Sequence, residues 1–204
     1  MRSRPAALAL LPSVIVPVLL VIVPTSLWPA VIGYHVLCLG FPLVHRQGRR
    51  EAGLVASAPR RWLPLTAALS IALLAGGELG RHVHWAPCLP DGSERVLGLA
   101  HPWWAFVAYS IVVNAVSEEY LWRGFLLPRT GVAWGGALFW LMHAAAASVF
   151  VSPWAAIGLT VPTLFAGLTW GWMRQRFGSL WPAIITHVAA DVAILRTAAT
   201  LVSA

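Results

Sequence analysis

The stretch that decides the fold runs Asn114-Ala-Val-Ser-Glu-Glu-Tyr-Leu-Trp-Arg123, inside an apolar segment from roughly Pro102 to Pro128. An ionisable side chain at the centre of a membrane helix costs about 2.5–3.5 kcal/mol, so three within six residues need a strong reason. On a helix, Glu119 and Arg123 share a face and can neutralise each other. Glu118 points about 100° away on that helix and must find its partner on another segment.

The composition is that of a membrane protein. Of 204 residues, 59% are hydrophobic and 10% are charged, whereas soluble domains contain about 25% charged residues. A net charge of +7 would suggest a nucleic-acid partner in a soluble protein. Here the basic residues gather at the ends of apolar segments, which indicates membrane topology and no nucleic-acid binding.

Apolar runs of about 20 residues predict an all-α, polytopic membrane helix bundle with about seven transmembrane helices. The N-terminus is interpreted as a first membrane helix rather than a signal peptide, because its apolar run is too long. Prolines in the first two segments leave open a single kinked, hairpin-like element. We expect one integrated domain, in which N-terminal helices (1–100) accompany a catalytic core (101–204). The predicted spans are 6–24, 27–44, 62–79, 102–128, 131–150, 154–173 and 179–201.

Arginines predict the orientation of the bundle, because cytoplasmic loops carry an excess of them. The N-terminus, the first long loop and two later turns are rich in arginine, whereas the intervening loops hold few charges. These positions predict that the N-terminus is cytoplasmic and the C-terminus lies outside. The arginines on the predicted cytoplasmic side are Arg2, Arg4, Arg46, Arg49, Arg50, Arg60, Arg61, Arg129, Arg174 and Arg176.

Two further polar clusters accompany the glutamates. Phe139 and His143 are four residues apart on one predicted helix, and His187 and Asp191 are four apart on another. At about 1.5 Å per residue, Glu118 lies about 15 Å from the cytoplasmic end of its helix, and the two histidines and Asp191 lie about 12–18 Å from theirs. In a hydrocarbon core about 30 Å thick, these side chains meet near the midplane. Their common depth indicates a functional site.

The residue types indicate the chemistry. A carboxylate beside histidine can act as a general base toward water, and a histidine can donate a hydrogen bond to an oxyanion. The pattern therefore predicts attack of water on a carbonyl group, with peptide hydrolysis as the natural reaction.

The ordered trio Glu-Glu-x-x-x-Arg, Phe-x-x-x-His and His-x-x-x-Asp resembles the CPBP family, which contains type II CAAX prenyl endopeptidases and bacteriocin-processing or self-immunity (Abi) proteins. The resemblance covers roughly residues 100–200. It implies an intramembrane endopeptidase in which Glu118 activates water and His143 helps to bind it. His187 and Asp191 would face the oxyanion, and Glu119, Arg123 and Phe139 would position the site. An ionised Asp cannot donate a hydrogen bond, so Asp191 is interpreted as orienting His187, or as donating only when protonated.

Three alternatives stay open. Glu118, His143, His187 and Asp191 could bind zinc, although we expect no cofactor. The same cavity could serve a non-enzymatic bacteriocin-immunity or peptide-binding protein, or a proton-coupled carrier. A metal site in the loop His82-x-His84…Cys88 and a serine protease mechanism are disfavoured.

We expect the substrate to be a membrane-associated protein or peptide, such as a CAAX-like tail, a bacteriocin leader or a C-terminal sorting signal. The expected location is a bacterial inner membrane. The cleavage site and the oligomeric state are not readable from the sequence.

Overall fold

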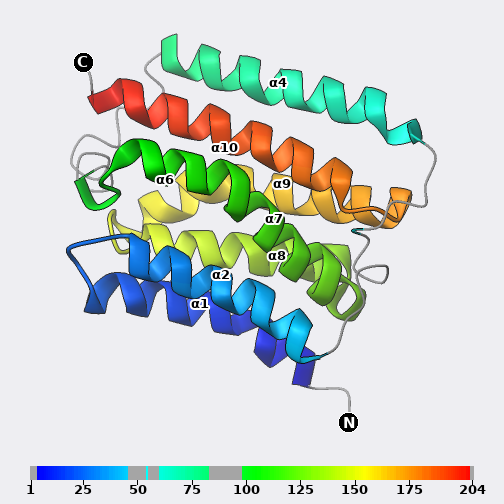
Figure 1. Ribbon diagram of the computed structural model, residues 1–204, viewed down its shortest axis with the longest axis horizontal. Coiled ribbons are helices and arrows are strands. Elements are labelled where there is room, and N and C mark those ends of the chain that lie inside the picture. The colour runs from blue at the N-terminus through cyan, green and yellow to red at the C-terminus, as the bar shows by residue number, and fades with distance from the viewer. Residues whose placement is uncertain (1–3, 46–53, 55–59, 83–97, 203–204) are drawn as a thin grey trace.

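The computed structural model describes residues 4–45, 54, 60–82 and 98–202. Within these ranges the regular structure is helical and includes no strand, which confirms the all-α fold class. Successive long helices run in alternating directions, so that their ends lie at two opposite ends of the bundle (Figure 1). The elements are α1 (Arg4–Ile22), α2 (Trp28–Val44), η1 (Arg60–Trp62), α4 (Leu63–His82), α6 (Trp103–Tyr109), η2 (Ser110–Asn114), α7 (Ala115–Glu119), η3 (Tyr120–Leu126), α8 (Leu127–Ala147), α9 (Pro153–Phe177) and α10 (Trp181–Val202).

The first two predicted spans are two separate helices. Pro12 and Pro17 lie inside α1 without ending it, and Pro42 lies inside α2. Such prolines are tolerated in membrane helices because neighbouring groups satisfy the freed backbone atoms. In the structure the two helices run antiparallel and pack against each other (Figure 1).

Local sequence explains where several helices end. Ser152 precedes α9 and its hydroxyl accepts a hydrogen bond from the Ala155 backbone N–H, a normal N-cap. Gly178 follows α9 with φ of 66°, the left-handed conformation that glycine adopts most easily at a helix C-terminus. Gly131 has φ of 76° and kinks α8 near its start, at the predicted turn before residue 131.

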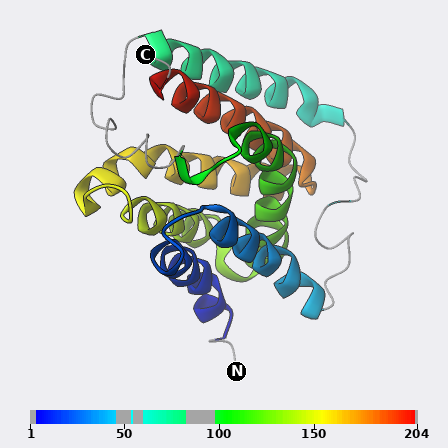
Figure 2. The same cartoon turned by 60° about the vertical axis from the view of Figure 1, so that its left-hand side comes forward.

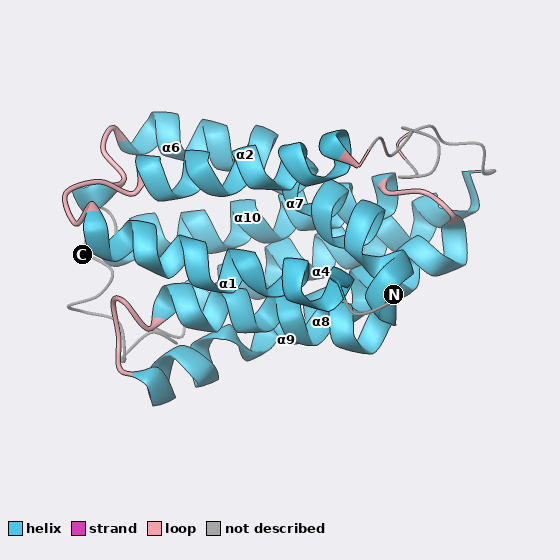
Figure 3. Cartoon of the chain, turned by 90° about the horizontal axis from the view of Figure 1, so that it is seen from below, coloured by secondary structure: helices cyan, strands magenta, loops and turns pink. Residues whose placement is uncertain are grey.

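Small residues allow two close helix contacts. α4 packs along α10, where a Cβ on Gly77 would lie 2.7 Å from the Cβ of Ala193. α8 packs on α9, where a Cβ on Gly167 would lie 3.1 Å from the Cα of Gly136. α1 lies against α8 and α2 on the other side of the bundle (Figures 2 and 3). The segment from α7 to η3 therefore packs against helices from both halves of the chain, namely α2, α8, α9 and α10.

The outer surface of the bundle is apolar. Large hydrophobic side chains are exposed on several helices, among them Ile71 on α4 and Phe165 on α9. Two described helices are long and apolar enough to cross a membrane, over Leu63–Gly80 and Pro153–Phe177. α1 begins at the end of the bundle opposite to the end where α10 finishes (Figure 1). Seven spans and an N-in, C-out orientation stay predictions, and most arginines of the first long loop lie outside the described residues.

Candidate active site

The site is built around α7, a short α-helical stretch between two π-helical segments, η2 and η3. A π-helical turn is rare and is frequently found at functional sites, because its extra residue changes which side chains face inward. Glu118 and Glu119 occupy the last two positions of α7, and Arg123 lies in η3. All three side chains are buried, with Glu119 completely inaccessible to solvent.

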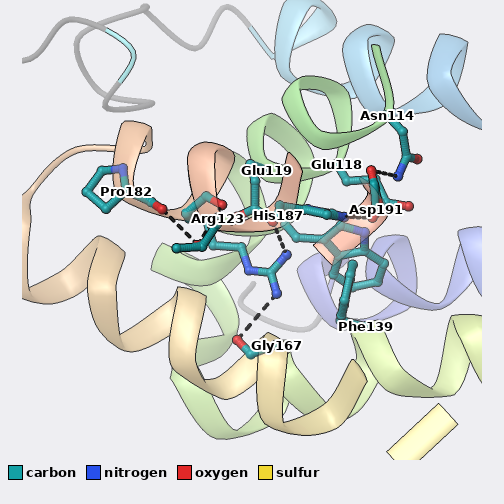
Figure 4. Close-up of polar contacts among 12 residues, drawn as sticks. Asn114, Glu118, Glu119, Arg123, Phe139, Gly167, Pro182, His187 and Asp191 are labelled. Carbon is teal, nitrogen blue, oxygen red and sulfur yellow. Dashed lines mark hydrogen bonds and ion pairs between the residues drawn. The ribbon is translucent and has the colours of Figure 1, made fainter. Parts of the chain in front are cut away.

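Glu119 and Arg123 form a buried ion pair. Arg123 Nη1 donates to Glu119 Oε1 over 2.7 Å, as their spacing of four residues predicts. Arg123 Nη2 also donates to the backbone carbonyl of Gly167 on α9, over 3.3 Å. The guanidinium lies over the rings of Phe139 and Trp170, at 4.3 and 5.0 Å from their centroids. Arg123 therefore joins η3 to α8 and α9 at the centre of the bundle (Figure 4).

His187 on α10 meets both glutamates. Its Nδ1 donates to Glu119 Oε1 over 2.9 Å, which fixes that nitrogen as the protonated one. Its Nε2 lies 3.6 Å from Glu118 Oε2 and 3.6 Å from Asp191 Oδ1, distances longer than a hydrogen bond. Trp170 stacks on the imidazole at a centroid distance of 4.2 Å. Glu119, rather than Asp191, is therefore the residue that orients His187.

Glu118 has an available carboxylate oxygen. Its side chain is buried, and Oε2 has no hydrogen-bond partner among the described residues. The neighbours of Glu118 include the hydroxyl of Tyr34 on α2, which also accepts a hydrogen bond from Trp122 Nε1 over 2.8 Å. A buried carboxylate oxygen without a donor needs a water or substrate group to satisfy it. Oε2 of Glu119 also has no partner among the described residues, but Oε1 of Glu119 is bonded to both Arg123 and His187, and this distinguishes it from Glu118.

His143 lies beside this group rather than in direct contact with Glu118. Its Nδ1 donates to the carbonyl of Phe139 over 2.9 Å, so in the neutral ring Nε2 is left as an acceptor. The Phe139 ring packs against His143 at 4.5 Å and against His187 at 6.2 Å between centroids. His143 is close enough to His187 and Asp191 to interact with both electrostatically.

Asp191 is held by residues on other helices. Asn114 Nδ2 donates to Asp191 Oδ2 over 3.2 Å (Figure 4). Asn114 Oδ1 in turn lies 2.9 Å from Nε2 of His35, a buried residue of α2. The sequence indicated neither contact, because residues 79 and 77 positions apart carry no local spacing signal.

Several neighbours of the site were missed by sequence reasoning. Trp170 and Tyr34 are aromatic residues in apolar helices, where packing in the core is the usual role. Asn114 offered a weak signal, since it is a polar residue in the middle of an apolar span. His35 offered the same signal in the first half of the chain.

The described residues contain no group of three or more His, Cys, Asp or Glu side chains arranged to hold a metal ion. In the proposed zinc set, both nitrogens of His187 already face carboxylates, and Nδ1 is committed to Glu119. The loop with His84 and Cys88 lies outside the described residues. Arg123 also lines a cavity of about 260 Å³ between the start of α8 and the end of α9.

The fold and the site define a class: helical membrane proteins that bury carboxylates and imidazoles from separate helices in one polar centre. The family model of the type II CAAX prenyl endopeptidase Rce1-like proteins matches residues 100–193. The chain belongs to this family of membrane proteases over that region, as its three motifs predicted. No curated protein and no solved structure matches the chain.

Proposed function

We propose that this protein is an intramembrane endopeptidase that uses Glu118 to activate water. The observation that carries the proposal is the buried Oε2 of Glu118, which faces Nε2 of His187 without a hydrogen-bond donor of its own. Membership in a CAAX prenyl endopeptidase family supports the reaction class.

In the proposed reaction, a water molecule at Glu118 gives its proton to the carboxylate. The hydroxide attacks the carbonyl carbon of the scissile peptide bond, and the carbonyl oxygen becomes an oxyanion. When the tetrahedral intermediate collapses, the carbon–nitrogen bond breaks and Glu118 returns the proton to the leaving amine. General base catalysis of this kind contributes about 10²–10⁴-fold to the rate.

The two histidines would have different roles. Neutral His143 can accept a hydrogen bond at Nε2 and so orient the attacking water, because Nδ1 is occupied by the Phe139 carbonyl. His187 can donate from Nε2 to the oxyanion when it carries a second proton, since Nδ1–H is directed at Glu119. Asp191, on the same side as Nε2, would stabilise that imidazolium form.

The proposed substrates are membrane-associated proteins or peptides that present a cleavable segment near the middle of the bilayer. A CAAX-like tail, a leader peptide or a C-terminal sorting segment would each fit the family's reaction. The proposed location is a bacterial inner membrane, oriented with the arginine-rich loops inside.

The test uses the source organism with the gene deleted and then restored as wild type or as Glu118→Gln. Mass spectrometry of the membrane and surface fractions would map the termini of every protein in each strain. We expect a set of cleaved termini that depends on the wild-type protein and is lost with Glu118→Gln at equal protein level. Identical termini in all three strains would overturn the proposal, and a biological effect retained by Glu118→Gln would favour the peptide-binding or immunity alternative.

A further inference from the structure

Helix α2 lies outside the family match at 100–193, yet it sends a polar side chain toward the site. His35 is 2% exposed and bonds through both ring nitrogens, to Tyr109 over 2.8 Å and to Asn114 over 2.9 Å. Burying a histidine among membrane helices costs free energy, and such residues are therefore rare and usually mark functional sites. The partners of His35 indicate what that function is.

The hydrogen bonds around His35 have only one consistent direction. Asn114 donates from Nδ2 to Asp191, so its Oδ1 is the atom that faces His35 and can only accept. His35 Nε2 must therefore carry the proton. In the neutral ring Nδ1 is then an acceptor, and the Tyr109 hydroxyl donates to it. The chain of donors runs from Tyr109 through His35 and Asn114 to the carboxylate of Asp191.

This direction matters because an amide can turn over and exchange its oxygen and nitrogen. Without the Nε2–H of His35, only an ionised Asp191 would favour the present orientation of Asn114. In the reversed orientation its carbonyl oxygen would face Asp191, and two acceptors would meet unless Asp191 were protonated. His35 thus keeps the amide nitrogen of Asn114 directed at Asp191 whether or not Asp191 is protonated, and so holds Asp191 beside His187.

We propose that His35 of α2 is a positioning residue of the active site, which acts through Asn114 to hold Asp191 as a hydrogen-bond acceptor beside His187. This inference rests on the proposed function of the site. The alternative is a merely structural hydrogen bond between α2 and η2, of the kind that membrane helices commonly form with each other. The two roles predict different cleavage rates for a variant that keeps the hydrogen bond to Tyr109 but loses the one to Asn114.

Two substitutions separate the two bonds. The amide nitrogen of Gln in His35→Gln reaches the position of Nε2 and can still donate to Asn114. The shorter amide in His35→Asn reaches only the position of Nδ1, so it can meet Tyr109 but leaves Asn114 without a donor. His45→Gln is the matched control, because His45 lies at the exposed end of the same helix, where among the described residues its side chain hydrogen-bonds the carbonyl of Phe41 and packs on Phe125.

The experiment measures how fast each variant forms the wild-type-dependent termini, at matched protein level in the membrane. We expect His35→Asn to slow cleavage by about 10–100-fold, the usual cost of losing a partner that orients an active-site residue. His35→Gln should restore most of the rate, and His45→Gln should equal the wild type. If His35→Asn cleaves like the wild type, or if His35→Gln is as slow as His35→Asn, the inference is overturned while the proposed function stands.

A second readout does not depend on any substrate. In purified protein with ¹⁵N-labelled histidine, NMR should show the His35 ring neutral and protonated at Nε2. A ring protonated at Nδ1, or at both nitrogens, would overturn the inference. Failure of the proposed function itself has a different signature, since then the wild type would form no specific termini at all.

Discussion

The adjacent residues Glu118 and Glu119 should respond in opposite ways to the same substitution. Glu119 accepts hydrogen bonds from Arg123 and His187 at Oε1, whereas Glu118 approaches His187 only at 3.6 Å, and neither Oε2 atom has a donor among the described residues. Changing each to Gln removes one negative charge and alters the shape of the side chain very little. The structure therefore predicts a loss of stability at Glu119 and a loss of activity without unfolding at Glu118.

The size of the loss at Glu119 follows from what its removal leaves behind. The side chain of Arg123 is 3% exposed, and breaking a buried ion pair by removing one partner costs about 3–5 kcal/mol. Arg123 would keep its bond to Gly167 and its contacts with Phe139 and Trp170, and desolvated cation–π contacts are worth about 2 kcal/mol. We therefore expect Glu119→Gln to lower the free energy of unfolding by about 3 kcal/mol, the lower end of that range.

The assay is reversible unfolding of the purified protein in mixed micelles, followed by circular dichroism. The free energy of unfolding of Glu118→Gln should equal or exceed that of the wild type, because the substitution removes a buried charge whose Oε2 has no donor. Adding Arg123→Met to Glu119→Gln should recover part of the loss, since both charges then disappear together. Equal unfolding free energies for the two Gln variants would refute the assignment of the ion pair as the structural half of the site.

Four further predictions follow from the geometry. His143→Ala and His187→Ala should each lower the cleavage rate by about 10²–10³-fold at normal protein level, because each loses one oriented polar group. A variant that cleaves at the wild-type rate would show that its histidine takes no part in catalysis. Gly167→Ala should cost about 1–3 kcal/mol of stability, because its Cβ would meet Gly136 at 3.1 Å, whereas Gly158→Ala on the same helix meets nothing within 4 Å and should be neutral. Cleavage should persist in a zinc chelator; loss that added zinc restores would favour the metal alternative. A reporter fused to the C-terminus should be active outside the cytoplasm, and activity inside would contradict the predicted orientation.

Much of the fold was predictable from the sequence because membrane helices leave strong signals. The break before residue 131 coincides with Gly131, whose positive φ ends one helical direction and begins the next. The pairing of Glu119 with Arg123 was equally predictable, because residues four apart on a helix are neighbours whatever surrounds them. The family resemblance rested on the same local spacings, and the match over residues 100–193 confirms it.

Other features depend on how the helices pack. The spacing of His187 and Asp191 suggested that Asp191 orients the imidazole, yet Glu119 on α7 lies closer and takes Nδ1. No local pattern shows which of two neighbouring glutamates will face a helix 68 residues away, because that depends on the rotation of α7 between two π-helical turns.

The sequence by itself determined which segments are helical, which polar side chains lie deep within them, and which pairs on one helix can meet, because helix periodicity and the cost of burying charge act locally. Only the tertiary structure decided that Glu119 holds both Arg123 and His187 while Glu118 faces Nε2 of His187 at 3.6 Å. It also brought His35 of α2 to Asn114, a contact between residues 79 positions apart. Such contacts are set by the rotation and approach of whole helices, which depend on the packing of the entire bundle rather than on any one stretch of chain.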